Sequence, residues 1–327
     1  MNATILSETV QSVSSQEQDL AQQLREASLA CRVSFTWFGV RKTLTPQEKA
    51  EAAAPFGAEA RFLSASKHLF NTRHPAYRAV TAIRSQVRRF WYEVSLPFPQ
   101  PGIRLIRRQD VTSIDRRLQH YREILHESVD RLENLYHQLQ DEARRRLGRL
   151  YRESDYPPSL RGLFDLQWDY PNVEPPEYLA RLAPQVYEAE CRRVQARFEE
   201  AVSLVEEAFS QQLRELVAHL VERLTPGPDG QPKIFRDSAV ESFQEFFRRF
   251  RTLVIRTPGE LEELVREAEG LLRGVRPEQL RRSGQLREEI RQGLEEVQER
   301  LDLWLVDRPR RRILCPQPLC DPSAKTL

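Results

Sequence analysis

Two long stretches of the chain repeat apolar residues every three or four positions, the spacing that places side chains on one face of an α-helix. The first runs from Asp110 to Arg152 and the second from Pro184 to Leu224. Each helix would be about 60 Å long at a rise of about 1.5 Å per residue. Because the lengths match and each helix must bury its apolar face, we predict a mainly α protein built on a long antiparallel, coiled-coil-like helical hairpin.

The connection between these helices, Tyr156–Ala183, combines prolines with many large apolar residues. A flexible linker would not contain so much apolar surface. We therefore predict a compact cap, rich in proline and aromatic residues, at the far end of the hairpin. Aromatic side chains dominate the hot spots of protein interfaces, so the predicted partner-binding residues are Phe164, Trp168, Tyr170 and Tyr178.

Two short segments have the pattern of β-strands. Arg32–Trp37 alternates polar and apolar residues, and Ile103–Arg107 is a short apolar run bounded by prolines and glycine. We expect them to form a small sheet, with Leu253–Ile255 or Arg312–Leu314 as candidates for a further strand.

These patterns divide the chain into three predicted regions. Residues 1–109 form a helical region with short strands, residues 110–225 form the hairpin with its cap at 156–183, and residues 226–327 form a helical region with a basic tail. Within the first region, Thr45 and Glu48 have the spacing of a capping box, which predicts the start of a helix.

The charge balance changes this picture little. The net charge is +2, with 30% charged residues, which is typical of long solvated helices and gives no whole-protein preference for nucleic acid. A cluster near the C-terminus is the exception, because few acidic residues offset it. Nucleic-acid binding through these arginines is therefore an alternative function: Arg308, Arg310, Arg311 and Arg312.

Searches for catalytic or cofactor signatures give no defensible site. No glycine-rich phosphate loop occurs, and the two thiols of Cys315 and Cys320 lack the second pair of ligands that zinc requires. Asp165, Asp169 and Glu174 could serve acid–base chemistry or hold a cation, but a polar rim around the aromatic residues is the favoured interpretation. We expect no enzyme, no cofactor and no metal, and keep an enzyme of unrecognised type as an alternative.

Cysteine usage and the N-terminus indicate the compartment. Four cysteines without a disulfide-type pattern are typical of a reducing environment. The first 24 residues lack the basic start and apolar run of a signal peptide, and no run approaches the length of a membrane span. We expect a cytoplasmic protein.

Four segments together resemble a bacterial and phage-type family known only as a domain of unknown function: Val33–Lys42, Pro101–Ile106, Tyr156–Phe164 and Val306–Arg310. The resemblance covers most of the chain. Members of that family can be encoded near AAA-type ATPases, which implies a partner or adaptor role and assigns no catalytic residue. We therefore expect a non-enzymatic scaffold or adaptor that binds a protein partner, with an AAA-type ATPase as one candidate and a homodimer as an alternative.

Overall fold

The computed structural model describes residues 18–226, 237–253 and 259–307. It confirms a mainly α protein with a small antiparallel sheet. The described residues group into two compact units. The first contains the described residues up to Val205 together with residues 251–253, and the second contains those from Glu206 to Phe250 and from Gly259 to Asp307. None of the described helices is long and apolar enough to cross a lipid bilayer.

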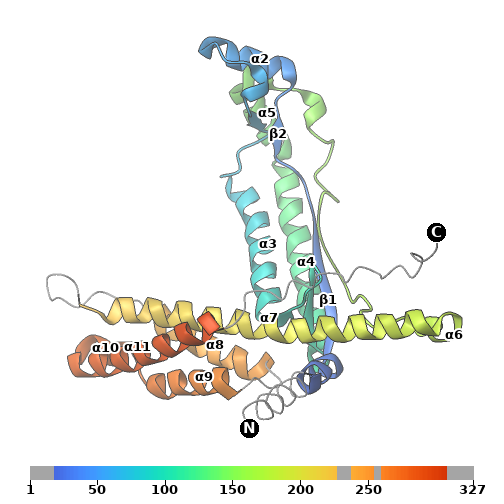
Figure 1. Cartoon of the computed structure of the whole chain (residues 1–327). Coiled ribbons are helices and arrows are strands. Elements are labelled where there is room, and N and C mark those ends of the chain that lie inside the picture. The colour runs from blue at the N-terminus through green and yellow to red at the C-terminus, as the bar shows by residue number, and fades with distance from the viewer. Residues whose placement is uncertain (1–17, 227–236, 254–258, 308–327) are drawn as a thin grey trace, which may run out of the picture. The chain divides into compact units, whose positions relative to one another are not determined.

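A four-stranded antiparallel sheet organises the first unit, in the order β4-β5-β1-β6 (Figure 1). The strands are β1 (Ser28–Trp37), β4 (Ser95–Pro97), β5 (Ile103–Arg107) and β6 (Phe164–Asp169). The two predicted strands therefore exist, and β5 has the predicted bounds. Leu253 instead ends a helix, and residues 254–255 and 312–314 lie outside the described part of the chain.

The alternation along β1 places one set of its side chains against helices. Cys31 and Val33 are buried in a core shared with α3 (Pro75–Glu93) and α4 (Val111–Asn134), and Phe35 and Trp37 pack against that core. α3 and α4 lie side by side on this face of the sheet (Figure 1). Successive strand residues point to opposite faces, so the residues between them, such as Ser34 and Thr36, are exposed.

The first predicted long helix is real but interrupted. α4 is preceded by a 3-10 turn at Arg108–Asp110, and the helix breaks at Leu135 before continuing as α5 (Tyr136–Leu147). Gly148 has a φ of 50°, which favours glycine, and ends the helix before the predicted Arg152.

The second predicted helix is observed with its predicted bounds, as α7 (Pro184–Leu224). The hairpin that would join it to the first is not shown. The apolar residues of α4, such as Leu118 and Leu125, belong to the core with α3 and the sheet. Phe198 of α7 contacts Phe98 of the first unit, with ring centroids 5.4 Å apart. An apolar face shows that a helix packs against something, but it does not show against what. The matched lengths of the two helices therefore predicted the wrong packing partner for each.

The segment Tyr156–Ala183, which we predicted to be a compact cap on the hairpin, has a different structure. Its middle part is β6, which adds to the edge of the sheet and packs on α4, and α6 (Tyr178–Leu182) follows it. The segment is therefore part of the first unit's sheet and core, because its apolar residues alternate as in a strand with one buried face.

In the sequence, the residues between β1 and α3 form a small lobe. It contains β2 (Arg41–Thr43) paired with β3 (Ser66–His68), α2 (Pro46–Ala53) and two 3-10 turns at Ala54–Phe56 and Ala60–Phe62. The predicted capping box at Thr45 and Glu48 is confirmed.

The second unit is helical over its described residues. The second half of α7 contributes Phe209, whose ring contacts Phe246 and Phe250 of α8 (Ser238–Leu253). The other helices are α9 (Gly259–Leu272), α10 (Pro277–Arg282) and α11 (Gly284–Asp307). Buried leucines and valines on one face of each helix form the core that joins α9 to α11.

Candidate functional site

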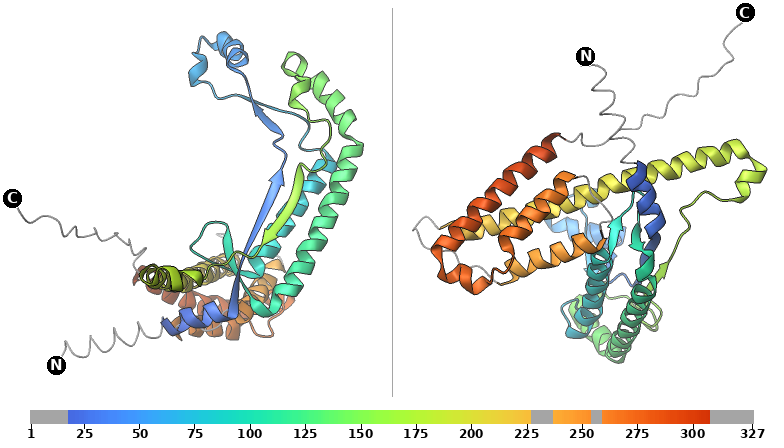
Figure 2. Two further views of the ribbon diagram at one scale, coloured as in Figure 1. Left: turned by 90° about the vertical axis from the view of Figure 1, so that its right-hand side faces the viewer. Right: turned by 90° about the horizontal axis from the view of Figure 1, so that it is seen from below.

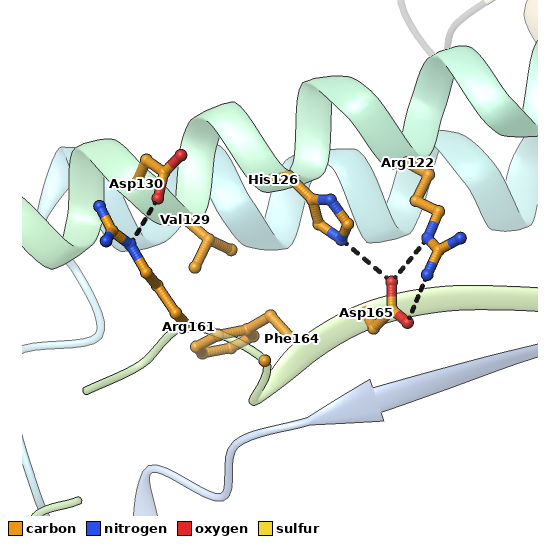
Figure 3. Close-up of a pocket in the computed structure, with 8 residues that line it drawn as sticks. Arg122, His126, Val129, Asp130, Arg161, Phe164 and Asp165 are labelled. Atoms are coloured by element: carbon orange, nitrogen blue, oxygen red, sulfur yellow. Dashed lines mark hydrogen bonds and ion pairs between the residues drawn. The ribbon is translucent and has the colours of Figure 1, made fainter. Parts of the chain in front are cut away.

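A hollow of about 390 Å³ lies between α4 and the start of β6 (Figure 3). Its main polar group is the Asp165 carboxylate. Arg122 donates two hydrogen bonds to it, at 2.9 and 3.1 Å, and Nε2 of His126 lies 3.0 Å from Oδ1. The backbone N–H of Leu166 also donates to Oδ1, at 2.9 Å. Every oxygen of this carboxylate therefore has a protein donor.

These donors decide the chemistry of Asp165. Burial alone would raise its pKa, but the hydrogen bonds from Arg122, His126 and the Gln167 side chain lower the pKa to about 2. A carboxylate with so low a pKa is a weak proton acceptor near neutral pH. On the other side of the hollow, Arg161 donates to Asp130 at 2.9 Å. The geometry favours a structural ion-pair cluster that fixes β6 to α4.

The three carboxylates considered from the sequence do not form one site. Asp165 pairs with Arg122, Asp169 pairs with Arg32, and Glu174 pairs with Arg25. Each carboxylate has a different arginine, from α4, β1 and the helical residues 18–27 respectively. Among the described residues, no group of three or more His, Cys, Asp or Glu could hold a metal ion.

Trp168 and Tyr170 are held against α4 by one carboxylate. The indole Nε1 of Trp168 donates to Oδ1 of Asp115 at 2.7 Å, and the hydroxyl of Tyr170 donates to the same oxygen at 3.2 Å. Burial, followed by the negative charge of Asp115, raises the pKa of Tyr170. Both polar groups are therefore used inside the protein, and both rings pack against the core.

The other two predicted contact residues have opposite environments. Phe164 is 1% exposed and contacts Trp37 edge-on, so it has no surface to offer a partner. Tyr178 is 64% exposed at the start of α6. Two further apolar side chains follow it closely, Leu182 at 77% and Val186 at 50% exposed. We call these three residues the α6 patch: Tyr178, Leu182 and Val186.

The sequence reasoning missed the α4 side of this region. Asp115, Arg122 and His126 follow one another at intervals of seven and four, which places them on one side of a helix. That spacing was a usable signal, but only the position of β6 shows that this side faces a strand. The predicted nucleic-acid residues, Arg308 and Arg310–Arg312, lie outside the described residues, as do Cys315 and Cys320.

Comparisons with family models, with curated proteins and with solved structures gave no match to this chain. The resemblance to a family of unknown function therefore stays a prediction.

Proposed function

We propose that this chain is a non-enzymatic scaffold or adaptor, and that the α6 patch is its contact surface for a protein partner. The supporting observation is the exposure of three large apolar side chains, Tyr178, Leu182 and Val186, within nine residues. Singly exposed apolar residues are ordinary, whereas exposed apolar residues that gather on the surface indicate an interaction site. The proposal is that these three side chains, which are close in the sequence, gather in this way. Tyrosine is also among the residue types that dominate hot spots.

The environments of the other three predicted aromatic residues make them poorer contact residues than Tyr178 of the α6 patch. Trp168 and Tyr170 are committed to Asp115, and Phe164 is buried. A partner that used them would first have to break these interactions. Of the aromatic residues predicted from the sequence, Tyr178 therefore remains the best contact residue.

An AAA-type ATPase is the candidate partner that the family resemblance implies, and a cytoplasmic location accords with sparse, unpatterned cysteines. A second copy of the chain is the alternative occupant of the patch. The nucleic-acid alternative stays a prediction, because Arg308 and Arg310–Arg312 lie outside the described residues.

The test is quantitative affinity capture from the native host with the full chain as bait. The variant Tyr178→Ala/Leu182→Ala should lose at least one captured partner by about tenfold, the effect of removing about 1.4 kcal/mol of binding free energy. The matched control is Leu303→Ala, which removes an apolar side chain that is 69% exposed on α11. Identical captured sets for the wild type, the patch variant and the control would refute the proposal.

A further inference from the structure

In the described part of the chain, one edge of β1 has no strand partner along half of its length. β5 pairs with Ser28–Arg32, and β6 pairs with Arg32–Trp37 on the opposite edge. Among the described residues, no strand pairs with Val33–Trp37 on the side of β5. We call this the open edge. Figure 2 shows β1 running on past the region where β5 accompanies it.

Alternate backbone N–H and C=O groups of Val33–Trp37 point away from β6, and no strand among the described residues pairs with them. Such an edge is a template for pairing with another chain, and proteins usually protect it with charges, bulges or covering elements. The outer edge of β6 has such protection, because the Asp165 carboxylate accepts a hydrogen bond from the backbone N–H of Leu166 and from Arg122. On β1, the side chains of Ser34 and Thr36 are exposed and neither is charged.

Two arginines of α3 lie beneath the open edge. The guanidinium of Arg84 lies 4.8 Å from the ring centroid of Trp37 and 5.5 Å from that of Phe35. The guanidinium of Arg88 lies 5.8 Å from the Phe35 ring centroid. Neither arginine has a carboxylate partner among the described residues, and Nε of Arg84 is buried without a hydrogen bond.

The two like charges disfavour each other. Burial, followed by the positive charge of Arg88, lowers the pKa of Arg84, although a guanidinium stays protonated at any physiological pH. The negative charge of an incoming anion near the two guanidinium groups would offset this repulsion.

The surrounding sequence has the same charge bias. From Arg61 to Gln109 the chain contains ten arginine and lysine residues and one acidic residue, Glu93. Glu93 is already paired with Arg89 at 3.3 Å. Arg61, Lys67 and Arg107 of this segment pair with carboxylates outside it, whereas no carboxylate among the described residues pairs with Arg84 or Arg88.

We propose that the open edge of β1 binds an extended acidic peptide, which adds as a further strand and directs alternate carboxylates towards Arg84 and Arg88. Strand addition uses main-chain hydrogen bonds for affinity and alternate side chains for specificity. This site is separate from the α6 patch and does not depend on the function proposed for it.

A peptide fits this site better than a nucleic acid does. Single-stranded nucleic acids use aromatic rings as stacking platforms. Here the rings of Phe35 and Trp37 are already contacted by guanidinium groups, and Trp37 also meets Phe164 edge-on at 4.9 Å. The groups without a strand partner among the described residues are backbone N–H and C=O, which pair with another backbone.

The test measures the binding of labelled peptides to the full chain by fluorescence anisotropy. The probe is an eight-residue peptide of alternating glutamate and threonine, and it should bind with an affinity that falls as salt is added. The same peptide with an N-methyl group on every backbone nitrogen keeps its charge but can donate no backbone hydrogen bond from either edge, so it should bind at least tenfold more weakly. Equal binding of the two peptides would overturn strand addition.

Variants locate the site. Arg84→Gln/Arg88→Gln should weaken binding about tenfold or more, whereas the control Arg78→Gln, an exposed arginine of α3 without a described aromatic contact, should change it less than twofold. Because loss of Arg84 could disturb packing, Arg88→Glu alone is the second variant. This variant should bind the acidic peptide more weakly than the wild type does, and it should bind a peptide of alternating lysine and threonine more tightly. Unchanged binding of both peptides to Arg88→Glu would overturn the site.

Two further measurements distinguish an acidic peptide from other possible ligands of the open edge. The first is the binding of an eight-nucleotide oligothymidylate. If it binds more tightly than the acidic peptide and loses affinity in the arginine variants, the site binds nucleic acid and the peptide proposal is overturned. A dimer in sedimentation velocity that Arg88→Glu dissociates would assign the edge to a second copy instead. Tyr178→Ala/Leu182→Ala should leave peptide binding unchanged, so failure of this proposal and failure of the proposed function are distinguishable.

Discussion

The Asp165 carboxylate attaches β6 to α4 through Arg122 and His126. Its pKa falls from the ordinary 3.8 to about 2 in the folded protein. A group with a lowered folded-state pKa stabilises the fold above its unfolded pKa, and that contribution is lost as the pH falls towards the folded value. The shift corresponds to about 2 kcal/mol.

We expect Asp165→Asn to be less stable than the wild type by about 1–2 kcal/mol at pH 7 and nearly equal to it close to pH 2. Urea unfolding from pH 7 to pH 2 measures the difference. The control is Asp130→Asn, whose pair with Arg161 is more than half exposed on both sides and should contribute little. A difference between wild type and Asp165→Asn that does not shrink below pH 4 would contradict the assignment.

Cys31 shows how burial controls reactivity at a single residue. It is fully buried, and burial, followed by the negative charges of Asp169 and Asp115, raises its pKa to about 12. Because the thiolate is the reactive form, Cys31 should resist alkylation at pH 8 in the native protein and react within minutes in denaturant. Iodoacetamide labelling followed by mass spectrometry of Cys191→Ser/Cys315→Ser/Cys320→Ser measures this. Fast native labelling would show that β1 is not packed as described.

At the scale of elements, Phe164 and Tyr178 provide a direct contrast between core and surface. Phe164 is buried against Trp37 at the start of β6, so Phe164→Ala should lower the free energy of unfolding by about 3–5 kcal/mol. Tyr178→Ala should change it by less than about 0.5 kcal/mol, as is usual for exposed positions. Denaturant titration of both variants is the measurement, and similar losses would contradict the described burial.

Local patterns predicted individual elements well. The alternation of Arg32–Trp37 located most of β1, the Ile103–Arg107 run gave β5, and the capping box placed the start of α2. β6 was missed because its apolar residues lie among prolines, and prolines indicate loops. The ion pairs of Asp165, Asp169 and Glu174 were unpredictable for a different reason: each joins residues more than 40 positions apart.

At the scale of the whole molecule, periodicity predicted that two long helices exist but not what covers them. Leu118 of α4 is buried with α3 and the sheet, and Phe209 of α7 is buried with α8. The continuous α7 spans residues of both compact units, so a boundary placed at the end of that helix could not match the contacts. Pairing of helices depends on long-range shape, which a one-dimensional pattern does not encode.

The shared use of β1 by two partners has a consequence for synthesis of the chain. β1 ends at Trp37, but β5 begins at Ile103 and β6 only at Phe164. A ribosome that adds roughly 5–20 residues per second leaves the second half of this strand without its neighbour for several seconds or more. Folding of the sheet therefore has a high contact order and should be slow. Until residue 169 has emerged, Val33–Trp37 of the nascent strand presents two unpaired edges to chaperones and to other nascent chains.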